Sequence, residues 1–495
     1  MCNDTQSLMM NTIPVEFIQQ LTRLLEPADL LQDAEDTRPY ECDGLSAYKQ
    51  LPTLVALPGS IEQIQRIVKL CHQYRVPIIA RGAGTGLSGG ALPIENGLVL
   101  SLAKFKHILN IDAQNRTACV QPGVRNLAIS ETVKEYGLFY APDPSSQIAC
   151  TIGGNVAENS GGVHCLKYGL TVHNVQKIKV ISITGELLTL GTDALDSPGY
   201  DLLALLNGSE GMLGIIVEVT VKLLPLPIQT RVMLAAFADI GNAGQSVADI
   251  ISAGIIPAGL EMMDELAIQA AEDFVHANYP RDAKAILLCE LDGIEEEVNE
   301  STEQVKKILL NQAATEIRIA NSEEERQLLW KGRKAAFPAV GRLAPDYYCM
   351  DGTIPRSRLA EVLEYIDKLS GEYNLRVANV FHAGDGNLHP LILYDANNDG
   401  ELERTEEFGG KILNYCVGVG GSITGEHGVG VEKIDQMCVQ FQALELQQFH
   451  DIKHAFDPLE LLNPGKAVPT LHRCAELGAM HVHHGKLPHP ELPRF

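Results

Sequence analysis

The sequence predicts an α+β protein built from two domains. Strand and helix patterns alternate from Pro52, a proline-rich stretch interrupts the chain at 223–231, and a new set of strands and helices begins beyond it. Short apolar runs bounded by glycine or proline indicate strands, and apolar residues spaced three and four apart indicate helices. A chain of 495 residues is long enough for about two to four domains.

We expect a charged, helical lead-in over 1–51 and a first domain over 52–228. Ser60 precedes an amphipathic stretch and suits the N-cap of its helix, because its hydroxyl can accept a hydrogen bond from the first turn. The elements expected in this domain are strands at 53–58, 76–80, 97–102 and 117–124, helices at 60–75 and 126–136, a hairpin over 174–190, and a strand at 214–227.

A second domain is expected over 229–470, followed by a tail over 471–495. Its expected elements are strands at 231–237, 379–384 and 387–394, and helices at 241–254, 295–312 and 401–418. The tail holds His481, His483 and His484, which could suggest a metal site. The prolines among them favour a flexible or partner-facing end instead.

Composition excludes several classes of protein. A net charge of −24 argues against a nucleic-acid-binding protein, which needs a basic surface. There is no apolar run of about 18 residues and no secretory signal at the N-terminus, so we expect a cytoplasmic protein without a membrane span. The 11 cysteines are scattered and form no Cys-x-x-Cys pair, which suits a reducing compartment and leaves no iron–sulfur or zinc-ribbon framework.

The first glycine-rich segment, "VPIIARGAGTGLSGGALP" (76–93), contains a formal Gly-x-Gly-x-x-Gly match at Gly84, Gly86 and Gly89. A nicotinamide-binding fingerprint would continue into a helix with an acidic residue about 20 positions on. Pro93 and another strand follow here, so we reject that interpretation. A loop of this composition exposes many backbone N–H groups and can approach a diphosphate closely.

Two further segments follow, "APDPSSQIACTIGGNVAENSGG" (141–162) and "GSEGMLGII" (208–216). In order and spacing, the three segments resemble the FAD-binding domain of the vanillyl-alcohol oxidase and p-cresol methylhydroxylase (PCMH) superfamily. The resemblance implies a PCMH-type domain of two α/β subdomains. Covalent relatives carry a histidine in the first loop, and none occurs between Arg81 and Ala91, so we expect non-covalent FAD. The residues expected to contact FAD are Gly82, Ala83, Gly84, Thr85, Gly86, Ser88, Gly89, Pro142, Asp143, Ser145, Ile152, Gly153, Gly154, Ala157, Asn159, Gly161, Gly162, Gly214, Ile215 and Asn463.

The stretch "NVFHAGDGNLHPLIL" (379–393) places two histidines around Asp385-Gly386, a strong hairpin signal. With those two residues as the turn, His382 faces His389 across the strands, with Cβ atoms roughly 4.5–5.5 Å apart. That spacing suits one metal ion, although two structural histidines remain an equal alternative from this stretch alone. "TGEHGVG" (424–430) adds Glu426, and two histidines with one carboxylate form a recurrent catalytic metal site.

The segments "HAGDGNLH", "TGEHG" and "LNPGK" resemble the C-terminal α+β domain of FAD-linked oxidases, a family with dehydrogenases for glycolate, D-lactate and D-2-hydroxyglutarate. The resemblance implies that His382, His389 and Glu426 bind one divalent ion, zinc or manganese. It also implies that His427 is the catalytic base and that Arg333 binds the substrate carboxylate. The expected reaction takes the hydroxyl proton to His427 and the Cα hydride to flavin N5.

Departures from the family indicate the substrate. Members that accept a five-carbon diacid carry Lys where Cys349 stands and Asn where Leu391 stands, so we expect a short monoacid, glycolate or D-lactate. Without iron–sulfur ligands, the reduced flavin needs an external acceptor, a quinone or an iron–sulfur partner subunit. Peripheral attachment to the inner membrane and homo-oligomerisation stay open. So do two alternatives, an oxygen-using oxidase and a non-catalytic flavin-binding assembly subunit. The complete set of five polar residues argues against the latter.

Overall fold

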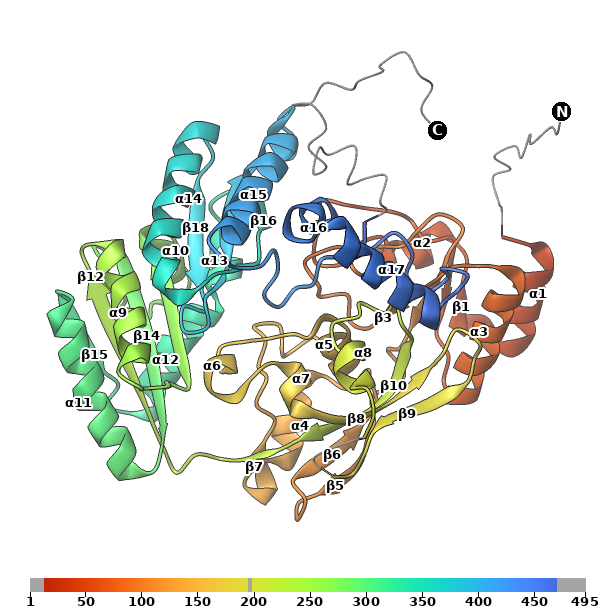
Figure 1. Cartoon of the computed structure of the whole chain (residues 1–495), viewed down its shortest axis with the longest axis horizontal. Coiled ribbons are helices and arrows are strands. Elements are labelled where there is room, and N and C mark those ends of the chain that lie inside the picture. The colour runs from red at the N-terminus through yellow and green to blue at the C-terminus, as the bar shows by residue number, and fades with distance from the viewer. Residues whose placement is uncertain (1–12, 195–197, 470–495) are drawn as a thin grey trace.

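The computed structural model describes residues 13–194 and 198–469, and these form two domains side by side with a cavity between them. Figure 1 shows the first domain in red to yellow and the second in green to cyan, with the last helices in blue. The predicted tail, with its three histidines, lies outside the described residues. No helix of the described part is long and apolar enough to cross a membrane.

The first sheet has the order β1-β2-β4-β3, in which β2, β4 and β3 run parallel. Its elements are β1 (Leu30–Leu31), β2 (Leu54–Ala56), β3 (Ile78–Arg81) and β4 (Leu98–Ser101), covered by α1 (Val15–Leu24) and α3 (Ile61–Tyr74). Ser60 caps α3 as predicted, accepting a hydrogen bond from the Gln63 N–H. The lead-in is only partly helical, because Leu30 and Leu31 pair antiparallel with β2.

The second sheet has the order β5-β6-β10-β8-β9, and every neighbouring pair is antiparallel. Its strands are β5 (Ile108–Asp112), β6 (Thr117–Val120), β8 (Val175–Ile181), β9 (Leu187–Gly191) and β10 (Ile215–Lys222). The neighbouring helices are α4 (Asn126–Val133), α5 (Ile152–Glu158), α6 (Cys165–Tyr168), α7 (Thr171–Asn174) and α8 (Leu202–Leu206), beside the small pair of β7 (Leu138–Phe139) and β11 (Leu224–Pro225). The predicted β8–β9 hairpin turns at Gly185, whose φ is +77°.

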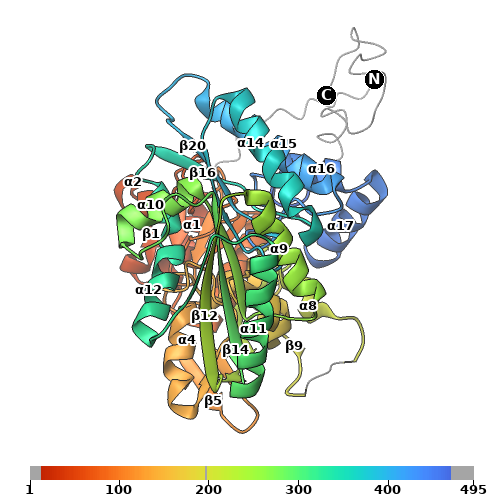
Figure 2. The ribbon, with the colours of Figure 1, turned by 90° about the vertical axis from the view of Figure 1, so that its left-hand side faces the viewer.

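The second domain is a seven-stranded antiparallel sheet of order β15-β12-β14-β13-β18-β20-β16. The strands are β12 (Gln229–Phe237), β13 (Gly259–Asp264), β14 (Ala285–Gly293), β15 (Glu316–Ile319), β16 (Asp346–Cys349), β18 (Val377–Phe381) and β20 (Pro390–Tyr394), with a small pair of β17 (Gly352–Thr353) and β19 (Asn387–Leu388). Figure 2 shows β12 and β14 with helices beside them.

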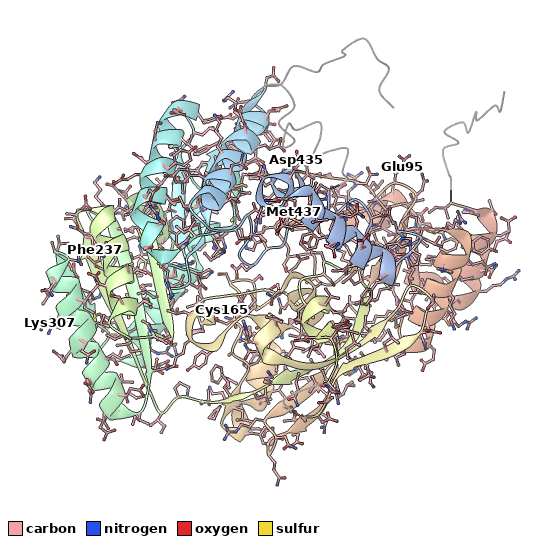
Figure 3. All side chains as sticks on the ribbon, viewed as in Figure 1. Glu95, Cys165, Phe237, Lys307, Asp435 and Met437 are labelled. Carbon is pink, nitrogen blue, oxygen red and sulfur yellow. The ribbon has the colours of Figure 1, made fainter. Side chains whose placement is uncertain are left out.

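Alternate residues of this sheet face two separate apolar cores. One face packs on α9 (Ile240–Ser252), α11 (Glu295–Asn311), α14 (Leu359–Tyr373) and α15 (Glu401–Gly418), and the other on α10 (Glu265–Val275), α12 (Glu323–Lys334) and α13 (Ala336–Val340). Phe237 belongs to the first core and is fully buried, whereas Lys307 on α11 is exposed to solvent (Figure 3). The α12 face leads to the site described below.

The chain closes by returning to the first domain. After α16 (Ile434–Gln440), α17 (Ala443–Phe456) lies over that domain, where the Lys453 ammonium donates to the Met212 carbonyl oxygen at 2.8 Å (Figure 1). Leu462 then bridges to Ile78 of β3. The predicted second domain, 229–470, therefore includes a closing segment that packs on the first.

Candidate active site

A cavity of about 460 Å³ lies between the two domains. The first glycine loop and the start of α5 form one wall, and side chains of the second domain form the other. Ten of the residues predicted to contact FAD line this cavity: Gly82, Ala83, Gly84, Thr85, Gly86, Ser145, Gly153, Gly154, Ala157 and Gly214. The volume lies in the range of pockets that bind cofactors and other small molecules, about 300–1,000 Å³.

The glycine loop presents unpaired backbone groups to the cavity. Within the described residues, none of the N–H groups of 83–90 donates a hydrogen bond to the protein. Gly84 has φ +70°, and a Cβ on it would meet the Arg81 side chain at 2.2 Å. Free N–H groups without side chains above them suit the phosphate oxygens of FAD. The residues present therefore fit the cofactor.

The other ten predicted contacts lie away from the cavity wall. They are Ser88, Gly89, Pro142, Asp143, Ile152, Asn159, Gly161, Gly162, Ile215 and Asn463. Ile152 and Ile215 are fully buried in apolar cores, and Asn159 is the C-cap of α5. Asp143 pairs with His164 instead, at 3.0 Å.

The hairpin that carries the two predicted metal-binding histidines has a different turn from the one expected. His382 bridges to Asn387, so the turn contains four residues, 383–386. A two-residue type I′ turn needs positive φ at both central positions, and of Asp385 and Gly386 only the glycine has it, at +84°. The Asp385 carboxylate instead accepts a hydrogen bond from the Asn387 N–H at 3.1 Å.

Because of this register, His389 lies diagonally from His382 rather than directly opposite. The His389 carbonyl oxygen accepts a hydrogen bond from the Val380 N–H at 3.3 Å. A shift by two residues keeps both side chains on the same face, since strands alternate with a period of two. The two imidazole rings still meet, with centroids 5.0 Å apart.

Glu426 completes a cluster with these histidines. Its Oε1 lies 3.4 Å from His382 Nε2 and 3.2 Å from His389 Nε2, and all three side chains are buried. Two ligands about 2.0–2.2 Å from one zinc ion in tetrahedral geometry are separated by roughly 3.3–3.6 Å. The two distances to Glu426 are therefore those of ligands around a single ion, and all three ligand atoms lie within 4.8 Å of one another.

The hydrogen bonding of the cluster also fits a cation. Glu261 Oε1 lies 2.9 Å from His382 Nδ1, which fixes the ring with Nε2 toward Glu426. In a neutral ring that nitrogen carries a lone pair. Among the described residues, neither ring nitrogen of His389 has a hydrogen bond, and Oε2 of Glu426 has none either. Such buried groups are costly without a partner, and a divalent ion such as zinc or manganese provides one.

Arg333 lies behind the cluster and is almost fully buried. Its Nη2 is 2.5 Å from Glu261 Oε2, so the same carboxylate holds both the arginine and His382. Burial raises the pKa of Glu261, but His382 and Arg333 outweigh burial and keep that pKa below its ordinary value. Arg333 does not line the cavity, and its Nε and Nη1 have no hydrogen-bond partner among the described residues.

The loop 424–430, which carries Glu426 and His427, is held by a buried carboxylate. Asp351 accepts hydrogen bonds from the N–H groups of Gly425, Glu426 and His427 at 3.1, 3.2 and 2.9 Å. It also accepts from the Asn387 amide at 2.7 Å, which ties the histidine hairpin to the same anchor. Asp351 therefore fixes the loop that carries Glu426 relative to the hairpin that carries His382 and His389.

Lys433 balances the charge of this anchor. Its fully buried ammonium lies 3.0 Å from Asp351 Oδ2 and donates to the Gly428 carbonyl oxygen at 3.0 Å. Burial raises the pKa of Asp351, but Lys433 and His427 overcome this and hold it well below its usual value. The anchor is thus an ion pair that is buried and hydrogen-bonded.

His427 lies on the cavity wall beside the cluster. Its ring stacks on His389 with centroids 4.9 Å apart, and its Nε2 is 3.7 Å from Glu426 Oε1. Burial lowers the pKa of His427 to about 4. A neutral imidazole with no hydrogen bond to its Nδ1 can accept a proton from a ligand in the cavity.

Sequence reasoning did not find Glu261, Asp351 or Lys433. Glu261 is the one charged residue within the apolar run "GLEMM" (259–263), which was a usable signal, because a buried strand rarely keeps an unpaired acid. Asp351 and Lys433 stand in ordinary polar contexts. Their roles depend on partners far away in the sequence, so no local pattern indicates them.

Two family models match the chain, one for each domain. Residues 226–467 match the family described as FAD linked oxidases, C-terminal domain, and residues 52–191 match the family described as FAD binding domain. Glycolate oxidase subunit GlcD of Escherichia coli strain K12 is 66% identical over 94% of this chain and 94% of that protein. GlcD of Bacillus subtilis strain 168 is 40% identical over 90% and 96%, and D-lactate dehydrogenase of Anaerostipes hadrus is 33% identical over 92% and 98%.

Solved structures share the fold. p-Cresol methylhydroxylase with substrate bound matches with a TM-score of 0.76 and 18% identity, covering 92% of this chain and 97% of that one. Alkyldihydroxyacetonephosphate synthase matches with a TM-score of 0.71 and 20% identity, covering 91% and 84%. The predicted PCMH-type FAD-binding fold with a C-terminal α+β domain is confirmed by these matches.

Proposed function

The chain belongs to the family of FAD-linked oxidases, and from that membership we propose a specific reaction and site. The protein is an FAD- and metal-dependent dehydrogenase that oxidises a short 2-hydroxy acid to the 2-keto acid. The observation that carries the proposal is that His389, Glu426 and His427 lie on the wall of the glycine-lined cavity, with His382 behind them against Glu426. The site is complete in its residues, which argues against a non-catalytic assembly subunit.

Arg333 and His427 have separate roles toward the substrate. The free guanidinium nitrogens of Arg333 bind the carboxylate of the 2-hydroxy acid. His427, whose ring is neutral, takes the hydroxyl proton. Glu261 orients both Arg333 and His382, so it fixes the carboxylate site relative to the metal ligands.

The two cofactors supply the chemistry that the side chains lack. The N–H groups of the glycine loop would hold FAD without a covalent bond, and the flavin would supply the acceptor for the Cα hydride. His382, His389 and Glu426 would hold a divalent ion, which would supply Lewis acidity toward the hydroxyl oxygen. The hydride and the proton together account for the oxidation.

The surroundings of the site favour glycolate or D-lactate over a diacid. Cys349 and Leu391 are directly opposed on β16 and β20 and are buried in the apolar core. Phe337, whose ring lies 5.9 Å from that of His389, lines the cavity. Cys349 and Leu391 do not line the cavity themselves, so they keep its surroundings apolar from behind, and a second carboxylate beside the Phe337 ring is costly without a partner.

Electrons leave through an external acceptor, either a quinone or an iron–sulfur partner subunit. Two relatives are named as subunits of glycolate oxidase, which supports a partner. We place the protein in the cytoplasm, where it reaches an acceptor at the inner membrane by peripheral contact. Relatives named for glycolate are also more similar than those named for D-lactate, which favours glycolate as substrate.

Anaerobic mixing tests the proposal. The purified yellow protein should bleach on addition of glycolate or D-lactate and should bleach poorly with 2-hydroxyglutarate. EDTA should remove the bleaching and leave the flavin bound. A flavin that no 2-hydroxy acid reduces, or full activity in metal-free protein, would overturn the proposal. Stoichiometric hydrogen peroxide in air would favour the oxygen-using oxidase instead.

A further inference from the structure

The loop that carries Glu426 and His427 is held from the FAD-binding domain as well as from its own domain. Glu210 accepts hydrogen bonds from the N–H groups of Val429 and Gly430, one on each carboxylate oxygen, both at 2.7 Å. Glu210 belongs to the first domain, and it is 219 residues away in sequence from Val429. The contact therefore joins the two walls of the cavity.

Glu210 is itself rigidly placed. It lies between α8 and β10, has φ +50° and is buried. Its carbonyl oxygen accepts a hydrogen bond from the Asn463 side chain at 2.7 Å, and its N–H donates to the Ala157 carbonyl oxygen at 2.8 Å. A carboxylate fixed in this way can transmit the position of the first domain to whatever it binds.

The approach of the loop to this carboxylate is close. Gly428 has φ +77°, and a Cβ on it would lie 3.0 Å from Glu210 Oε1 and 2.2 Å from Glu158 Oε2. Ser88, at the end of the FAD-binding loop, donates its hydroxyl to the His427 carbonyl oxygen at 2.9 Å. The segment after His427 thus rests on the first domain over several residues.

We propose that Glu210 is a positioning residue that sets Glu426 and His427 against the flavin cavity. The inference rests on the proposed function, since it assigns the alignment of that reaction to a side chain outside the metal cluster. Among the described residues, neither Arg333 nor the histidine hairpin forms a hydrogen bond or ion pair with Glu210, so we expect substrate binding to change little. Loss of Glu210 therefore affects the chemical step and the hold on the metal through Glu426.

The variant Glu210→Gln tests this, because an amide cannot accept a hydrogen bond on both of its terminal atoms. Asp264→Asn is the matched control. Asp264 is a buried carboxylate that accepts the N–H groups of Ala267 and Asn379 at 2.9 and 2.8 Å, and it lies outside the cavity wall. Both variants make the same chemical change to a carboxylate that holds two backbone groups.

The measurements use the holoenzyme, with FAD and metal, mixed anaerobically with glycolate. Glu210→Gln should slow flavin reduction at saturating glycolate by about 10–100-fold, the cost of a small misplacement of reacting groups. The KM should change by less than about threefold, since ground-state binding is retained. Dithionite should reduce both flavins equally. Asp264→Asn should lose thermal stability and reduce at the wild-type rate.

Reduction of Glu210→Gln at the wild-type rate, or equal slowing in both variants, would overturn the inference. If Glu210→Gln does not fold, Glu210→Asp replaces it, because aspartate shortens the side chain by one methylene. Its rate of flavin reduction is then compared with those of the wild type and of Asp264→Asn in the same way. Failure of the wild-type flavin to bleach would count against the proposed function alone. Metal retention on dialysis then decides the inference: Glu210→Gln should lose zinc or manganese faster than Asp264→Asn, and equal retention would refute it.

Discussion

Two glycine-rich loops meet at the cavity, and they use their backbones in opposite ways. The loop at 83–90 leaves its N–H groups without partners in the described residues. The loop at 424–430 has five of its N–H groups bound by two buried carboxylates, Asp351 and Glu210. The first loop can therefore bind a ligand through its backbone, and the second holds side chains in place.

The difference shows that glycine content alone does not define what a loop does. In the first loop, glycine keeps the space above the backbone open. In the second, glycine lets the chain approach a carboxylate, as at Gly428. Changes to the two loops should therefore affect different cofactors, and the following predictions begin with the largest effect.

Asp351→Asn should produce the largest loss. The amide cannot accept from every donor that meets Asp351, and it leaves the buried Lys433 with only the more distant Glu432 carboxylate, at 3.8 Å. Breaking a buried ion pair in this way costs about 3–5 kcal/mol of unfolding free energy. We expect the protein to lose its metal and its turnover, measured by metal analysis and by chemical unfolding. Retained metal with normal turnover would show that the second loop does not need its anchor.

His427→Ala should slow the chemical step without disturbing either loop. A positioned general base contributes about 10²–10⁴-fold to a rate. We expect anaerobic flavin reduction to slow by a factor in that range, with the flavin spectrum and the metal content unchanged. A reduction rate within about threefold of wild type would assign the base to another group. Lost metal would mean that His427 only packs beneath the cluster.

Gly84→Ala should weaken FAD and spare the metal. Gly84 has φ +70°, where an alanine is strained by roughly 1–2 kcal/mol, and its methyl group would meet Arg81. If the loop shifts to relieve this strain, the FAD dissociation constant should rise by about five- to thirtyfold, measured by fluorescence of released flavin. Equal loss of metal and FAD would contradict the inference that the first loop binds FAD and the second loop positions a metal ligand.

Ser88→Ala should have the smallest effect. It tests both loops at once, because Ser88 belongs to the first loop and its hydroxyl donates to the second. It removes the hydrogen bond to the His427 carbonyl oxygen, a neutral contact of about 0.5–1.5 kcal/mol. Flavin reduction should slow by no more than about tenfold, with FAD and metal retained. Loss of bound FAD instead would place Ser88 among the cofactor contacts, as its sequence position suggests.

Much of the fold was predictable, and the misses have a physical reason. The helix expected at 401–418 is α15, Glu401–Gly418, because its apolar spacing and its glycine boundaries are clear. The strands β13 and β14 were missed. Both are buried on both faces, so their sequences lack the alternation that identifies a strand with one exposed face.

The site likewise contains residues that the sequence predicts and residues that it does not. His382, His389, Glu426 and His427 carry recognisable side chains in short motifs, and the structure brings them together. The turn between the histidines was mistaken because Asp-Gly fits more than one loop length. The positions of the FAD-loop residues were harder, since a backbone contact leaves little trace in the identity of a side chain.

The pairing of Glu261 with Arg333 has a consequence for charge neutrality. Arg333 is matched by Glu261 and Lys433 by Asp351, so neither cation is paired with Glu426. A divalent ion held by His382, His389 and Glu426 would exceed the charge of Glu426 by one, and a monocarboxylate substrate would balance that excess. A dicarboxylate would leave an unmatched negative charge there. With the proposed ion bound, we therefore expect ionic balance to favour a monocarboxylate independently of the shape of the pocket.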